Sequence, residues 1–157
     1  NMVVTPTLYD SLGGTTMVTD PSNPSQMIEK GRLGIRSVVD STIFVIAADT
    51  ALNKFFPVLL AEVTGGNTTG FSALSKNLTD FFCVATGAKN FTYSGMNMVG
   101  AHDPAKNPRM NGKSSSADFD RFVTDLVTGA KKVGLSDQLI GQVGAVVNTT
   151  RPQVIQK

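Results

Sequence analysis

The sequence predicts an all-α protein that folds as one domain. Four segments repeat apolar residues with helical spacing, and no segment of comparable length alternates as a half-buried strand would. The chain has 157 residues, of which 41% are hydrophobic. That is enough for one compact core and too little for two, so residues 1–157 are expected to form a single domain.

The charge and hydropathy of the chain exclude two classes of partner. Lys and Arg number 14 and Asp and Glu 12, which leaves a net charge of +2 without any basic run. A nucleic-acid surface is therefore not expected. The longest apolar runs, residues 43–48 and 55–61, fall far short of the ~20 residues that cross a bilayer. Charged residues make up only 17% of a chain rich in Thr and Asn. A composition with few charges and many Thr and Asn residues favours an exported protein, periplasmic or secreted, over a cytoplasmic one.

The first two helices are predicted around residues 35–46 and 71–85. In each segment the apolar positions return to one face of a helix. The first face is made of Ile35, Val38, Val39, Thr42, Ile43 and Ile46. The second face is made of Phe71, Leu74, Leu78, Phe81, Phe82 and Ala85.

Two further helices are predicted in the C-terminal third, each with its own start and stop signals. One follows the capping candidates Ser114–Ser116 and ends near Lys131 and Lys132, before Gly134. The other opens at Ser136 and stops near Pro152. Their apolar faces are Phe119, Phe122, Val123, Leu126, Val127 and Ala130, and then Leu139, Ile140, Val143, Val146 and Val147.

Turn-rich stretches separate the helices at residues 20–24, 64–70 and 103–109. Glycine and proline are dense there. The sequence therefore predicts short helices with long connections, unlike an idealised four-helix bundle.

Only one cysteine, Cys83, and one histidine, His102, are present. An intrachain disulfide, a four-cysteine zinc site and a structural His/Cys zinc site are thereby excluded. Cys83 follows two phenylalanines in an apolar segment, so a buried thiol is expected. A Cys83–His102 dyad in a small thiol enzyme or hydrolase stays open as an alternative.

Four motifs in series resemble the truncated haemoglobins, most closely group 1. Residues 8–14, Leu-Tyr-Asp-Ser-Leu-Gly-Gly, are similar to the short first helix of that family and its Gly-Gly turn. The segment from Val38-Val39-Asp40 to Phe55-Phe56 keeps the family's spacing without a gap. Phe81-Phe82 matches paired aromatics of the next long helix. Residues 93–102 match the pattern Tyr-x-Gly-x-x-Met-x-x-x-His.

The chain departs from the family at its connections. Insertions are predicted at residues 15–30, at residues 58–70 and after His102, and the second Gly-Gly of the family is Gly87-Ala88 here. The resemblance therefore implies a two-over-two helical sandwich of truncated-globin type with long inserted loops.

The resemblance also implies a haem b cofactor with His102 as the proximal iron ligand. A neutral imidazole is the common protein ligand in oxygen-binding globins, and its other ring nitrogen should donate to a nearby carbonyl. The remaining haem contacts implied are Phe56, Phe81, Tyr93 and Met98. Lys76 and Met96 are the side chains considered as an internal sixth ligand. Arg109, Lys89 and Lys106 could pair with propionates and are left unassigned.

The distal side is expected to be apolar. Counted back from Phe56, the family's distal tyrosine position holds Ile43, and counted back from Phe81, the two distal-helix positions hold Leu74 and Leu78. If the alignment to the family were shifted by one residue, Thr42, Phe44 or Asn77 would occupy these positions. Without a hydrogen-bond donor, bound dioxygen is held less well, whereas carbon monoxide and nitric oxide lose less.

The resulting hypothesis is a globin that binds a diatomic gas (oxygen, nitric oxide or carbon monoxide). The resemblance implies oxygen binding or transport, or nitric oxide detoxification. A nitric oxide dioxygenase or peroxidase-like activity, a redox partner and a role in sensing are left open. The main alternative is a globin-like sensory or interaction domain without haem.

Overall fold

The protein is predominantly helical, as its periodicity predicts. The computed structural model describes residues 7–107, 109 and 111–157. The helices are α1 (Leu8–Ser11), α2 (Lys30–Ala48), η1 (Asn53–Phe55), α3 (Pro57–Thr64), α4 (Thr69–Thr86), α5 (Met98–Ala101), α6 (Ser116–Lys132), α7 (Asp137–Asn148) and α8 (Arg151–Val154). Among the described residues, no helix combines the length and apolar character that a bilayer crossing needs.

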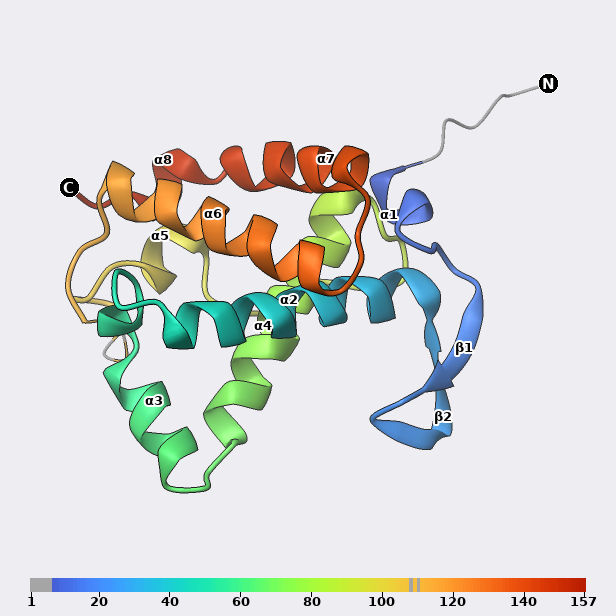
Figure 1. Cartoon of the computed structure of the whole chain (residues 1–157), viewed down its shortest axis with the longest axis horizontal. Helices are drawn as coiled ribbons and strands as arrows, with labels where there is room; N and C mark the ends of the chain where they lie inside the picture. Colours follow the sequence, from blue (N-terminus) through green and yellow to red (C-terminus); the bar gives the residue numbers. More distant parts are fainter. Residues whose placement is uncertain (1–6, 108, 110) are drawn as a thin grey trace.

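Two pairs of long helices form the layers of the fold. Helix α2 packs on α4, α6 packs on α7, and the contact between α2 and α6 joins the two pairs most extensively. Figure 1 shows α6 and α7 running antiparallel beside each other, with α2 crossing in front of α4. The predicted two-over-two helical sandwich is confirmed.

The core follows the predicted apolar faces of α2, α6 and α7. All six positions of the first face, from Ile35 to Ile46, are buried. Phe119, Leu126 and Ala130 are buried on α6, and Ile140, Val143 and Val147 on α7. The predicted caps are also present, because Ser115 forms a capping box with Asp118 and the Ser136 side chain accepts from Leu139 N.

Glycines permit two close approaches that organise the fold. Gly13 and Gly14 have φ of +134° and +63°, so the predicted Gly-Gly turn uses backbone conformations that favour glycine. At the crossing of α2 and α6, a Cβ on Gly129 would lie 2.6 Å from Thr42 Oγ1 and 2.8 Å from the Thr42 backbone. Ser41 Oγ donates to the Gly129 carbonyl at 2.9 Å, which joins the helices at this point.

The first inserted segment was expected to be a loop, and this expectation is wrong. It folds into a hairpin of β1 (Met17–Asp20) and β2 (Asn23–Glu29), with Val18 opposite Ile28. Figure 1 shows the hairpin projecting beyond the start of α2. Most of its residues are exposed, and only the four-residue β1 alternates between exposed and partly buried positions, which is too short a pattern to predict a strand from sequence.

The second inserted segment is also more ordered than predicted. It contains α3, which begins at Pro57, where the missing N–H costs no hydrogen bond. The segment after His102 has no regular secondary structure among its described residues up to Ser115. It is tied to α3 by an ion pair between Arg109 Nη2 and Glu62 Oε1 at 2.5 Å. Arg109, which the sequence left unassigned among the possible propionate partners, therefore pairs within the chain.

A buried pair of aspartates lies where the end of α2 meets α6. Arg121 Nε lies 2.6 Å from Asp49 Oδ2, and its Nη2 lies 3.1 Å from Asp49 Oδ1. These hydrogen bonds hold the pKa of Asp49 well below its usual range. Asp125 is 3% exposed, and its Oδ2 has no partner among the described residues. Burial, with the adjacent carboxylate of Asp49, raises the pKa of Asp125 to about 6.

Enlarging Gly129 should weaken the α2–α6 crossing. Gly129→Ala is expected to lower the free energy of unfolding in urea by about 1–3 kcal/mol, because the added methyl group overlaps Thr42. Gly141→Ala in α7 is the matched control, since no atom lies within 4 Å of its Cβ position. The control should gain up to about 1 kcal/mol from helix propensity. Equal effects of the two substitutions would contradict the close crossing.

The aspartate pair should make stability depend on pH. Asp125 binds its proton more tightly in the folded chain than in the unfolded chain, where its pKa is about 4. Its contribution to the free energy of unfolding therefore falls as the pH rises from about 4 to about 6. Asp125→Asn should be more stable than the parent by about 1–2 kcal/mol near pH 7.5, with the gain vanishing near pH 4.

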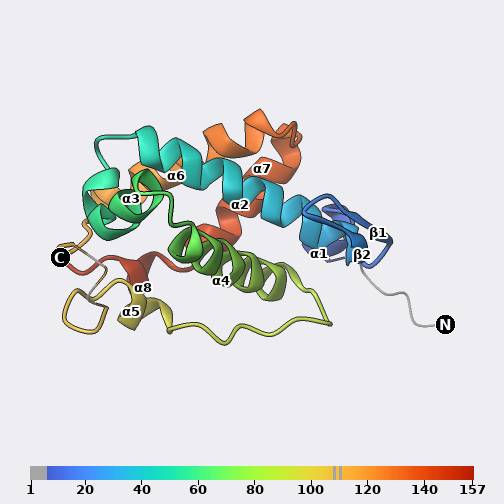
Figure 2. The same ribbon diagram turned by 90° about the horizontal axis from the view of Figure 1, so that it is seen from below.

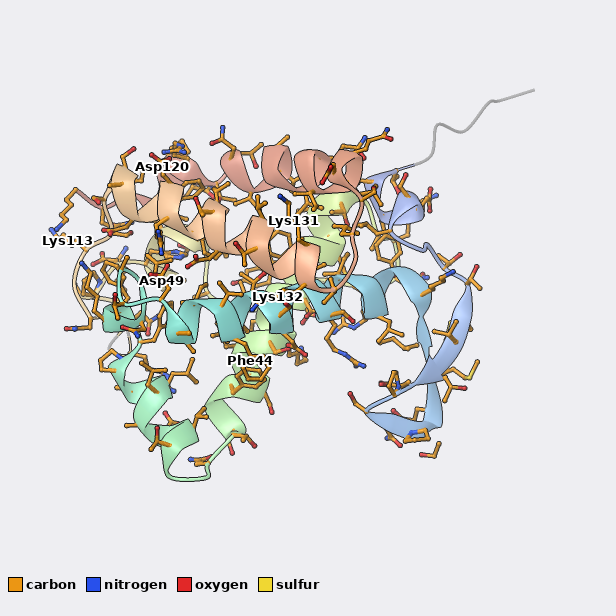
Figure 3. All side chains as sticks on the ribbon, in the orientation of Figure 1. Phe44, Asp49, Lys113, Asp120, Lys131 and Lys132 are labelled. Atoms are coloured by element: carbon orange, nitrogen blue, oxygen red, sulfur yellow. The ribbon has the colours of Figure 1, made fainter. Side chains whose placement is uncertain are left out.

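Urea titrations of both proteins across this pH range measure that difference. Asp120→Asn is the control, because the Asp120 side chain is 64% exposed on the same helix (Figure 3). Its effect should stay within about 0.5 kcal/mol at every pH. A gain of the Asp125 variant that does not change with pH would contradict the assignment.

Candidate functional site

His102 ends the one-turn helix α5. Its side chain is partly buried, and its Nδ1 lies 2.8 Å from the Met98 carbonyl. A carbonyl can only accept, so Nδ1 carries the proton and the lone pair resides on Nε2. No described residue hydrogen-bonds to Nε2. Burial lowers the pKa of the imidazole, partly opposed by the Met98 carbonyl, and the neutral form that can ligate a metal is therefore favoured.

Tyr93 connects this proximal segment to helix α4. Its hydroxyl donates to the Met96 carbonyl, and its ring meets Phe81 edge-on with centroids 5.7 Å apart. The glycine of the Tyr-x-Gly motif has a physical reason here, since a Cβ on Gly95 would lie 2.7 Å from the Tyr93 hydroxyl. In Figure 2 the extended segment between α4 and α5 runs below α4.

Helix α4 has an unusual distribution of burial. Of the predicted apolar face, Phe71, Leu74, Leu78 and Phe81 are only partly buried, Ala85 is exposed and Phe82 is buried. The other buried positions of the helix are small or polar, namely Ser75, Thr79, Asp80, Cys83 and Thr86. A helix normally buries its apolar stripe in the core. Here Phe81 contacts Tyr93, in the segment that leads to His102, while Leu78 borders a core cavity and Phe71 meets Phe44.

The predicted distal residues Ile43 and Leu78 come together. Both line a small apolar cavity of about 20 Å³. Of the residues that an alignment shifted by one position would place there, Thr42 lines the same cavity and Phe44 does not. Thr42 donates to the Val38 carbonyl and packs on Gly129, while Phe44 is 65% exposed and stacks near Phe71 (Figure 3).

Two other predicted contact residues, Phe56 and Met98, lie in separate parts of the fold. Phe56 packs against a second cluster made of Ile46, Leu52 and Phe55. Met98, at the first position of α5, is partly buried. Helix α5 packs mainly against α8, as Figure 2 also shows.

Neither candidate for an internal sixth ligand is poised for that role. Lys76 is 63% exposed, and its Nζ pairs with Asp80 at 2.8 Å. Met96 is 44% exposed.

The geometry gives no support to a thiol enzyme. Cys83 is fully buried, and burial raises the pKa of its thiol to about 11. Its sulfur lies 3.8 Å from Arg32 Nη1, while His102 Nδ1 bonds to Met98. The expectation of a buried, unreactive thiol agrees with this environment.

The residues present fit a haem better than a bare metal ion. No cluster of three His, Cys, Asp or Glu side chains that could hold a metal ion occurs among the described residues. A haem needs only one strong protein ligand together with apolar surface for its ring. His102 offers an unbonded Nε2, and the α4 stripe offers apolar side chains that are not fully covered.

Asn97 is a site residue that the sequence interpretation missed. Its side-chain oxygen accepts from Gly100 N at 2.7 Å, which caps α5. Asparagine is a preferred N-cap residue, so its presence is a sequence signal for the start of a helix. The helix that follows has only four residues, too few to show the periodicity that would make this signal recognisable.

Comparison with known proteins agrees with the fold. No family model matches the chain. A group 1 truncated hemoglobin of Tetrahymena thermophila is 33% identical over 89 residues, which cover 57% of this chain and 67% of that protein.

Two solved structures share the architecture. The Fe(III) form of truncated hemoglobin from Tetrahymena pyriformis superposes with a TM-score of 0.68 at 22% identity, covering 97% of this chain and 100% of that one. The 2/2 hemoglobin of Synechococcus sp. PCC 7002, in the cyanomet state with covalently attached heme, superposes with a TM-score of 0.65 at 21% identity. The match again covers 97% of this chain and 100% of that one. With the identity and coverage of the Tetrahymena thermophila relative, these matches show that the chain belongs to the truncated haemoglobin family, group 1.

Proposed function

We propose that this globin binds haem b through Nε2 of His102 and uses it to bind a diatomic gas. The observation that carries the proposal is a histidine with an unbonded Nε2, in a segment that meets the partly buried Phe81 of α4 through Tyr93. A bound haem would supply the iron on which the gas is held. The chain would supply one ligand, an apolar wall and exclusion of water.

The proximal residues would act by orienting the imidazole. The Met98 carbonyl holds Nδ1–H, which fixes the tautomer and raises the basicity of Nε2. Phe81 and Tyr93, which meet edge-on, would form part of the wall beside the ring.

The distal residues would set which gas is retained. Ile43, Leu74 and Leu78 carry no donor, so a polar ligand such as bound dioxygen would gain no hydrogen bond from them. One net hydrogen bond is worth about 0.5–1.5 kcal/mol. We therefore propose a pocket that retains nitric oxide or carbon monoxide in preference to oxygen. A role in nitric oxide chemistry or sensing fits this better than oxygen storage.

Removal of the imidazole should abolish normal haem binding. Purified protein with added haemin is expected to show a Soret band that shifts with carbon monoxide in the ferrous form, and His102→Ala should lose this spectrum. Cys83→Ala is the control and should keep it, because its thiol lies in the core. A folded parent chain that takes up no haemin would favour the haem-free sensory or interaction domain instead.

Adding a distal donor should slow the release of oxygen. Leu78→Gln or Ile43→Tyr is expected to lower the oxygen dissociation rate by up to about tenfold, since 1.4 kcal/mol corresponds to one decade. Stopped-flow displacement of oxygen by carbon monoxide measures this rate. Phe44→Tyr is the matched control, because Phe44 adjoins Ile43 in sequence but is exposed. If the control slows release and the other two do not, the register of α2 is wrong.

A further inference from the structure

Helix α5 is too short to fix the orientation of His102 by itself. It has four residues, Met98–Ala101, of which only Gly100 is buried. A single helical turn is unstable in isolation, because nucleation fixes several residues for one hydrogen bond. Side chains outside the turn must therefore hold it in place.

The Met98 carbonyl is the point through which this turn controls the histidine. It accepts from the backbone N of His102 at 3.3 Å and from the imidazole Nδ1 at 2.8 Å. The orientation of the ring therefore depends on where this carbonyl points, and that direction is set where α5 begins.

Asn97 occupies that beginning. It has extended backbone angles, φ −60° and ψ 156°, and its Oδ1 accepts from Gly100 N at 2.7 Å. Its own carbonyl accepts from Ala101 N at 2.8 Å. Both bonds form only if the peptide between Asn97 and Gly100 turns helically, which aligns the Met98 carbonyl with the ring.

Two other side chains hold the flanks of the turn. The Tyr93 hydroxyl donates to the Met96 carbonyl, and Asn107 Nδ2 donates to the Ala101 carbonyl at 2.8 Å. Neither bond reaches the Met98 peptide. Asn97 is therefore the side chain whose loss should disturb the histidine most directly.

We propose that Asn97 is a positioning residue for His102, because its cap on α5 orients the Met98 carbonyl that receives Nδ1–H and so keeps Nε2 as the ligating nitrogen. The inference rests on the proposed function where it concerns haem. Its effect on the imidazole tautomer can be measured without haem.

The first measurement uses the chain without haem. His102 is the single histidine, so ¹⁵N NMR at a pH where the ring is neutral reports one imidazole. The parent chain should show protonated Nδ1 and unprotonated Nε2. Asn97→Ala should shift the tautomers toward protonated Nε2, and Asn97→Asp, which retains a capping oxygen, should restore the parent signature.

The second measurement follows haem loss from the loaded protein to an excess of apomyoglobin. Asn97→Ala should lose haem on the order of tenfold faster than the parent, as expected when the support of a metal ligand is removed. Asn97→Asp should stay within about twofold of the parent. The iron–histidine stretching band of the ferrous protein should shift in the alanine variant alone.

Ser136→Ala is the matched control, because it removes an N-cap from α7 and leaves α5 intact. It should change neither the tautomer nor haem loss. If Asn97→Ala does not fold, Asn97→Gln replaces it, since the longer amide cannot reach the capping position.

The outcomes separate the two proposals. Parent-like tautomer and haem loss in Asn97→Ala or Asn97→Gln would overturn the positioning role, as would equal changes in Ser136→Ala. Absence of haem uptake by the parent chain would defeat the proposed function instead, and the tautomer measurement would still decide the role of Asn97.

Discussion

Helix α4 has to serve two surfaces at once, and the location of the site depends on how it does so. Its small and polar side chains face the core, where most of them find partners. Ser75 donates to Asp40, Thr86 to the Phe82 carbonyl, and Asp80 pairs with Arg32. The bulky side chains from Phe71 to Phe81 lie on the adjoining face of the helix and pack against the edge of the core. There Leu78 borders the cavity beside Ile43, and Phe81 meets Tyr93 on the approach to His102.

The two sides of the proposed site would be built by different kinds of interaction. The proposed distal side rests on the packed core, since Ile43 is buried in α2 and shares a cavity with Leu78. The proposed proximal side rests on hydrogen bonds between the side chains of Tyr93, Asn97 and Asn107 and the backbone around α5.

The three inserted segments lie outside the four long helices that form the core. The hairpin precedes α2, and α3 lies between η1 and α4. The segment after His102 is fixed to the region of η1 and α3 through Arg109 and through Asn111, whose backbone N donates to the Phe55 carbonyl. These insertions therefore reshape the surroundings of the site, while the crossing of α2 and α6 at Gly129 keeps the sandwich intact.

The sequence by itself determined the helices with a buried face, their caps and the single candidate ligand. Periodicity was sufficient for α2, α6 and α7 because each buries one apolar stripe in the core. It also predicted that Ile43 and Leu78 lie on apolar helix faces. The family motifs supplied the order of the elements and the importance of His102.

Only the tertiary structure decided which face of α4 enters the core, that residues 17–29 form a hairpin, and that the Met98 carbonyl accepts the hydrogen bond from His102 Nδ1. It also decided that Asp125 lies against Asp49. The physical reason is the same in each case. Local periodicity reports that a residue is apolar at a given place on an element, whereas burial and hydrogen bonding depend on the neighbouring element, whose position is set by the packing of the whole chain.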